Sequence, residues 1–173
     1  MIFKPEETKA LNTLAGWMGV PADWLYKLIM FESSWKPLAR NKTSGARGLI
    51  QFMPQTARDL GYKTADEIVE KYPAIASQLL GPVAAYFKLP GKKGPWRTKQ
   101  SLYMAVFYPA HRDVPPDTMF SALARKSNPG IDTVQDYVNY VEGIRKPFKG
   151  GSMGLVMLLL GIGYFAAKKF NLI

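Results

Sequence analysis

Apolar residues recur at helical spacing along most of this chain, and glycine or proline interrupts them at short intervals. The first run places Leu11, Leu14 and Met18 on one face and ends at Gly19. A helix with one buried face has this spacing, whereas a strand alternates polar and apolar residues. Sustained alternation is absent from the sequence, although residues 47–52 are compatible with a short extended piece. The spacing therefore predicts a mainly α-helical protein.

Further helices are predicted from capping residues and from proline in a first turn. They begin near Pro21, Pro54, Thr64, Ala74, Thr98 and Thr133. The helix over residues 74–89 is expected to break or restart at Gly81-Pro82. Three prolines between residues 109 and 116 predict a mostly irregular connection, and the last of these helices is expected to end near Lys146.

The composition limits the chemistry that is open to the chain. Its 173 residues suffice for one ordinary domain, with no cysteine and His111 as the single histidine. Thiolate and histidine-rich metal sites are therefore not expected, and neither is a cofactor, so carboxylates, hydroxyls and amides must act. The net charge of +10 favours anionic partners, but the cations are scattered and no specific nucleic-acid partner is predicted.

Residues 150–167 contain no charged side chain and lie between basic flanks. As a helix they would span roughly 27 Å, close to the thickness of a bilayer's hydrocarbon core. We expect a folded domain over residues 1–146 and a membrane anchor over residues 147–173. The alternative is a final core helix of the domain. The amino terminus shows no cleavable secretory signal.

One acidic residue follows the apolar stripe of the second predicted helix. Leu25 and Leu28 precede Glu32 by seven and four positions, so all three share one face. Burial beside Phe31 and Trp35 would disfavour the carboxylate and raise its pKa, as a general acid working near neutral pH requires. The alternative is an ordinary solvated glutamate in a last helical turn.

Two adjoining motifs resemble those of the lytic transglycosylases with the goose-lysozyme-like (SLT) fold, which cut the glycan strands of peptidoglycan. They are ESSWKPLA at residues 32–39 and GARGLIQFMPQTA at residues 45–57. More loosely, the resemblance extends over roughly residues 15–146. It implies a lysozyme-like single domain in which Glu32 is catalytic and peptidoglycan strands are the partner.

The same resemblance implies a set of substrate-binding residues around the glutamate: Ser33, Gln51, Phe52, Tyr108 and Tyr137. Gln51 would contact N-acetyl or hydroxyl groups of the sugar beside a loop that its glycines let approach closely. The alternative is that the side chain of Gln51 bonds to the local backbone. Tyr108 stands where the family usually has asparagine. Tyr137 would hydrogen-bond Glu32. The alternative is that Tyr137 is simply an aromatic core residue.

No second carboxylate is paired with Glu32 by sequence, since Asp23 lies about 13 Å away along the helix and Asp59 lies beyond the glycine loop. We therefore expect Glu32 to act as both acid and base, with the C6 hydroxyl of muramic acid closing a 1,6-anhydro ring. The alternatives are a muramidase that uses water held by an aspartate such as Asp59, and a non-catalytic membrane-associated virion protein.

The apolar tail and the wall substrate together suggest a setting. We expect a protein of a bacteriophage virion, anchored in its membrane or entry apparatus, that acts in the host periplasm during genome entry. Other virion proteins would then be possible partners. The alternative is a bacterial envelope enzyme that reaches the wall by tail insertion or by a secretion machine.

Overall fold

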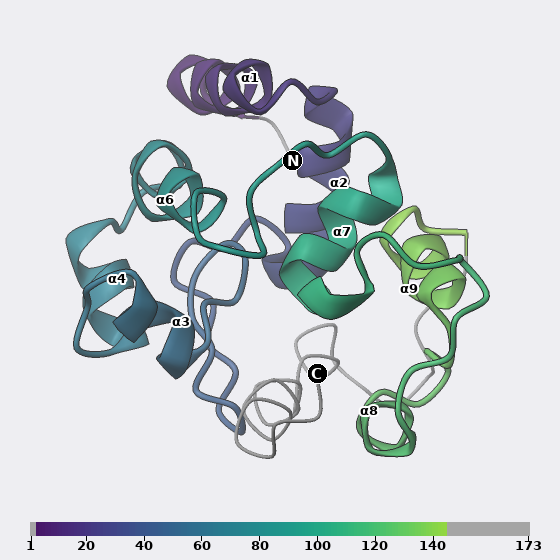
Figure 1. Cartoon of the computed structure of the whole chain (residues 1–173). Coiled ribbons are helices and arrows are strands. Elements are labelled where there is room, and N and C mark those ends of the chain that lie inside the picture. Colours follow the sequence, from purple (N-terminus) through teal and green to yellow (C-terminus); the bar gives the residue numbers. More distant parts are fainter. Residues whose placement is uncertain (1–2, 145–173) are drawn as a thin grey trace.

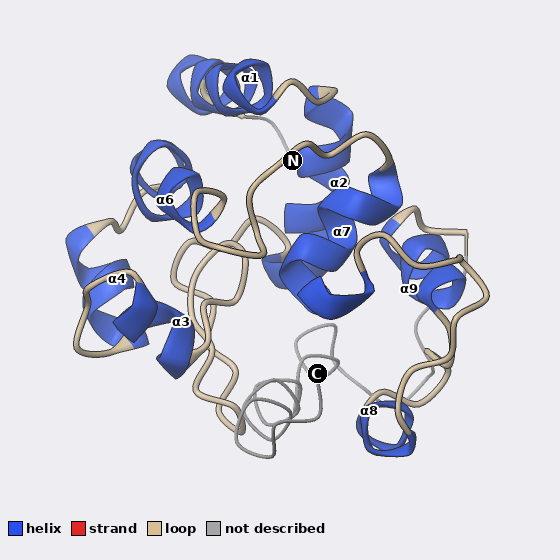
Figure 2. Ribbon diagram, in the orientation of Figure 1, coloured by secondary structure: helices blue, strands red, loops and turns tan. Residues whose placement is uncertain are grey.

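The computed structural model describes residues 3–144, and within them helices and loops account for the fold, with isolated bridges in place of strands (Figure 2). The mainly α prediction is confirmed for this part of the chain. The elements, in chain order, are α1 (Pro5–Met18), α2 (Ala22–Ser33), α3 (Pro54–Asp59), α4 (Ala65–Lys71), α5 (Ile75–Gln78), a π-helical turn η1 (Leu79–Val83), α6 (Ala84–Tyr86), α7 (Lys99–Phe107), a 3-10 turn η2 (Pro109–His111), α8 (Ala122–Ser127) and α9 (Val134–Val141).

Helix α2 lies at the centre of the arrangement and packs against α1, α7 and α9 (Figure 1). Figure 1 shows α3, α4 and α6 on one side of α7, with α8 and α9 on the other. Leu25, Leu28 and Ile29 of α2 are fully buried in the core. Because this helix is surrounded, a polar residue at its carboxyl end is brought into the interior.

Local signals mark the helix boundaries where they were predicted. Gly19 adopts a left-handed conformation (φ 68°) and ends α1. Thr98 and Thr133 each form a complete capping box at the start of α7 and α9. At α4 the box is incomplete, because Glu67 accepts a hydrogen bond from the backbone of Lys63 instead of returning to the capping threonine.

The predicted break at Gly81-Pro82 takes the form of a wider turn. Helix α5 continues through the π-helical turn η1 into α6, with Pro82 inside the turn. Proline has no N–H to give to the ladder, and a wider turn tolerates that loss without ending the helix. The segment therefore remains one helical path with a local irregularity.

The connection between α7 and α9 is mostly irregular, as predicted, but it also contains η2 and the unpredicted helix α8. Helix α8 is capped by Ser121, whose side chain accepts from the backbone of Ala124. One prediction about this part of the chain is wrong. The last predicted helix ends at Val141 and not near Lys146, because Gly143 turns left-handed (φ 73°). The start of α8 and the end of α9 each depend on a single residue, Ser121 and Gly143.

The predicted membrane anchor, residues 147–173, lies outside the described residues. Among helices of residues 3–144, none combines the length and apolar character that a bilayer crossing requires.

Candidate active site

Glu32 occupies the last turn of α2 and is 2% exposed. The helix ends directly after it, because Ser34 and Trp35 both adopt positive φ values, 53° and 60°. Such a conformation is uncommon for a side chain as large as tryptophan, and it persists only where the surroundings enforce it. Trp35 is itself 1% exposed. The turn therefore fixes the glutamate at the point where the chain leaves the core.

The hydrogen bond predicted for Tyr137 is present. Its hydroxyl donates to Glu32 Oε1 at 2.8 Å, across 105 positions of the sequence. Its ring is fully buried, stacks on Phe107 with centroids 4.0 Å apart, and meets Phe31 edge-on. Tyr137 is thus also an aromatic core residue, and its packing between α2 and α7 holds the hydroxyl in place.

Burial raises the pKa of Glu32 to about 8, and the hydrogen bond from Tyr137 lowers it by less. The side chain therefore holds a proton near neutral pH, as the sequence predicts. Its other oxygen, Oε2, is buried and has no hydrogen-bond partner among the described residues. A protonated Oε2 is a donor without an acceptor, and such an atom is costly unless a ligand supplies the partner.

Gln51 and Phe52 lie in the loop that follows Glu32. The side-chain nitrogen of Gln51 donates to the carbonyl of Gly48 at 2.9 Å, and the residue is 4% exposed. This is the local backbone bond that stood as the alternative for Gln51. The ring of Phe52 is 1% exposed and meets Tyr86 edge-on. Both side chains are buried and make their contacts with neighbouring parts of the protein.

A glutamine that the sequence reasoning missed holds this loop. Gln78 is fully buried, and its Oε1 accepts from the backbone of Leu49 while its Nε2 donates to the carbonyls of Pro37 and Tyr72. Gly48 has φ 77°, and a Cβ there would lie 2.8 Å from Oε1 of Gln78. The close approach that this glycine permits is therefore to Gln78. The sequence signal that could have identified Gln78 is a single amide side chain within the apolar helical run of residues 74–89.

Ser33 and Tyr108 have other immediate partners. The hydroxyl of Ser33 donates to the carbonyl of Ile29 in the same helix at 3.2 Å. Tyr108 follows α7, is partly exposed, and packs edge-on against His111 and Phe120. Of the five residues predicted around Glu32, only Tyr137 has a hydrogen bond to it in the described part of the chain.

The two aspartates considered as second acids interact elsewhere. Asp23 pairs with Lys27 one turn along α2, at 2.9 Å. Asp59 lies on α3 and accepts from the side chain of Gln55 at 2.8 Å. Within residues 3–144, neither makes a contact with Glu32 that would form a carboxylate pair.

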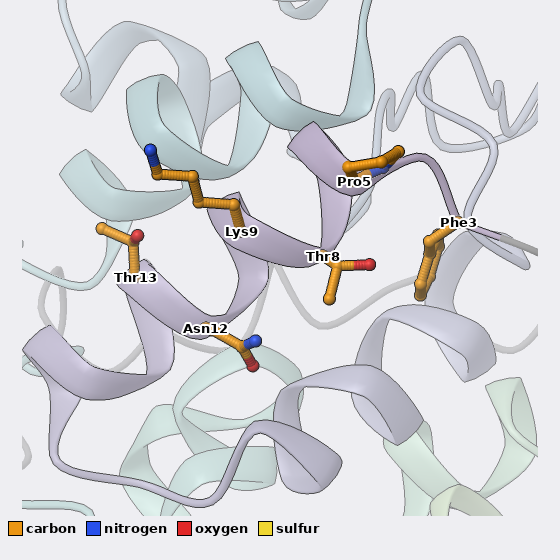
Figure 3. Close-up of a pocket in the computed structure, with 6 residues that line it drawn as sticks. All are labelled: Phe3, Pro5, Thr8, Lys9, Asn12 and Thr13. Carbon is orange, nitrogen blue, oxygen red and sulfur yellow. The ribbon is translucent and has the colours of Figure 1, made fainter.

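A shallow depression lies along α1 and does not include the glutamate. Phe3 and five residues of α1 line it: Pro5, Thr8, Lys9, Asn12 and Thr13 (Figure 3). Its lining contains no carboxylate, so it offers no acid for bond cleavage.

A family model for the transglycosylase SLT domain matches residues 11–98, just over half of the chain. The protein belongs to this family, whose members are lytic transglycosylases, and membership supports cleavage of peptidoglycan glycosidic bonds. The match includes Glu32, Ser33, Gln51 and Phe52 and ends before Tyr108 and Tyr137. No curated protein and no solved structure matches the chain.

Proposed function

We propose that the protein cleaves the β-1,4 bond between N-acetylmuramic acid and N-acetylglucosamine by lytic transglycosylation, with Glu32 as the single acid and base. The observation that carries the proposal is the buried, protonated carboxyl group whose Oε2 lacks a partner among the described residues. An acid with a pKa of about 8 donates readily near neutral pH, where an ordinary glutamate is already ionised.

The proposed reaction balances without water. Glu32 Oε2 gives its proton to the glycosidic oxygen as the bond from C1 of muramic acid breaks. The C6 hydroxyl oxygen of the same sugar then bonds to C1 and passes its proton to the carboxylate, which restores the acid. Because nucleophile and electrophile belong to one sugar, the attack needs little further ordering.

Burial and Tyr137 have complementary roles in this cycle. The dry surroundings make the carboxylate form unfavourable, which drives recovery of the proton in the second step. The hydroxyl of Tyr137 meanwhile donates to Oε1 and limits the cost of the transient charge. A carboxyl group without a charged partner is thereby able to alternate between its two forms.

The products identify the reaction. We expect purified sacculi digested in ¹⁸O-water to yield anhydro-muramic ends that carry no label. Mass spectrometry of the products measures this. Labelled reducing ends would instead establish a muramidase. The variant Glu32→Gln should lose activity by about 10³-fold. Asp59→Asn is the matched control, because it also removes one carboxylate, and it should retain activity. Full activity in Glu32→Gln would exclude catalysis through Glu32, and a wild type that releases no products would leave the non-catalytic alternative.

We further propose that residues 150–167 anchor the domain in a membrane, and that the enzyme is carried by a virion and cuts the host wall during genome entry. The uncharged run between basic flanks supports the anchor. The full chain should float with lipid vesicles after a high-salt wash, whereas a variant with two lysines inside the run should not. Release by salt alone would contradict insertion, and absence from purified particles would contradict the virion setting.

A further inference from the structure

The stretch between Glu70 and Asp113 contains seven lysines and arginines and no acidic residue. Two of these cations have carboxylate partners elsewhere, namely Lys99 with Glu142 and Arg112 with the following Asp113. The loop from α6 to α7 lies in the middle of this stretch and passes between the two helices (Figure 1). It carries four of the seven cations, namely Lys88, Lys92, Lys93 and Arg97.

Lys92 is the member of this loop that is drawn inward. Its Nζ lies over the ring of Tyr86, 5.3 Å from the centroid, and its side chain is partly buried. Within residues 3–144 it has no carboxylate within ion-pair distance, and Asp59 acts on it only through its longer-range field. Burial lowers the pKa of Lys92 to about 8. A partly desolvated cation without a counter-ion favours an anionic ligand.

Tyr86 connects Lys92 to the candidate active site. Its hydroxyl donates to the carbonyl of Ala105 in α7, and its ring meets Phe52 from the loop after Glu32. The negative charge of an ionised Glu32 would raise the pKa of Tyr86 further, so the two groups lie within electrostatic range. Lys92 therefore contacts an aromatic side chain that lies within electrostatic range of the reacting glutamate.

We propose that Lys92 binds a carboxylate of the peptide attached to muramic acid, and so makes the enzyme favour glycan whose peptides carry free carboxylates. This inference rests on the proposed function, because a glycan strand seated at Glu32 brings its peptides to the same neighbourhood. Where a peptide is attached, the lactyl carboxyl of muramic acid is an amide, so the negative charges of such a strand are the carboxylates of its peptides. A single cation beside the site thus distinguishes peptides with free carboxylates from peptides whose carboxylates are amidated.

The test pairs a change in the enzyme with a change in the substrate. Soluble glycan fragments are prepared with free peptide carboxylates and with the same groups converted to amides. For the wild-type chain, we expect kcat/KM to fall by about 10-fold on the amidated form, through KM. Lys92→Met should give the low value on both forms, and Lys92→Arg should restore the preference. Lys93→Met removes the neighbouring, exposed charge and should behave as the wild type.

Two results would overturn the proposal. One is a wild type that acts equally on the native and the amidated form. The other is a preference that persists in Lys92→Met, and an equal loss on both substrates in that variant would indicate a purely structural lysine. Thermal melting identifies a variant that fails to fold, in which case Lys92→Gln, which keeps a polar side chain without the charge, takes the place of Lys92→Met and should also give the low value on both forms. Co-sedimentation of each full-length chain with native and amidated sacculi, at about 0.15 M salt, measures the same preference without catalysis. A wild type that releases no anhydro ends but retains the binding preference would refute only the proposed reaction.

Discussion

Two glutamates in this molecule each accept a hydrogen bond from a tyrosine hydroxyl, yet their pKa values move in opposite directions. Tyr137 donates to Glu32 at 2.8 Å, and Tyr103 donates to Glu142 at 2.5 Å. Burial raises the pKa of Glu32 to about 8. Burial also pushes the pKa of Glu142 upward, but hydrogen bonds from its neighbours outweigh it, and the pKa is lowered.

Two lysines account for the difference. Lys99 Nζ lies 2.6 Å and Lys27 Nζ 3.2 Å from Glu142 Oε2, whereas Glu32 has no cation within ion-pair distance among the described residues. Glu142 therefore stays ionised and ties the end of α9 to α2 and α7. Glu32 keeps its proton and the capacity to transfer it. The same side chain serves the fold at one place and chemistry at the other, according to its neighbours.

The largest expected effect concerns the cost of burying Glu32. The folded state holds the proton of Glu32 up to about pH 8, whereas the unfolded state releases it near pH 4.5. Burying Glu32 therefore costs no stability through its titration below pH 4.5, and the folded state loses stability as the pH rises from 4.5 to about 8. Glu32→Gln removes the penalty and should raise the free energy of unfolding by about 3 kcal/mol at pH 7. Urea unfolding at pH 7 and pH 4 measures it. An equal gain at both pH values would contradict the pKa assigned to Glu32.

The second site should respond with the opposite sign. Glu142→Gln breaks both ion pairs and should lower the free energy of unfolding by about 2 kcal/mol at pH 7, less than a fully buried pair because the lysines are partly exposed. Since the folded pKa is depressed, this stabilisation is present above the unfolded pKa and is lost as the pH falls through the folded value. Glu70→Gln, on the exposed face of α4, is the control and should change little. A Glu142→Gln chain as stable as this control would mean that the ion pairs do not hold the helices.

The smallest effect concerns the tyrosine at the candidate active site. Tyr137→Phe removes a hydrogen bond that lowers the pKa of Glu32, so the pKa should rise further. We expect the alkaline limb of the kcat/KM profile to move to higher pH, and kcat to fall by about 10-fold as the transient carboxylate loses a donor. Tyr103→Phe is the matched control, with the profile unmoved. An alkaline limb that stays in place or moves downward would separate Tyr137 from the titration of Glu32.

Local signals made most of the fold predictable. The apolar face of α2 placed Glu32 in the interior, and Gly19 and Thr133 marked helix boundaries, because each acts on residues within one turn of itself. Helix α8 was missed because six residues carry too little periodicity to be recognised. The form of the irregularity at Pro82 depends on packing around the turn and had no local signature.

The sequence by itself determined that Glu32 would face the core and that its acidity would be altered. Only the tertiary structure decided which groups surround each carboxylate: Tyr137 meets Glu32 across 105 positions, and Lys27 meets Glu142 across 115. The position of Gln78 behind the glycine loop was decided in the same way. Electrostatic effects depend on distances in space, and residues so far apart along the chain come within range only once the helices have packed.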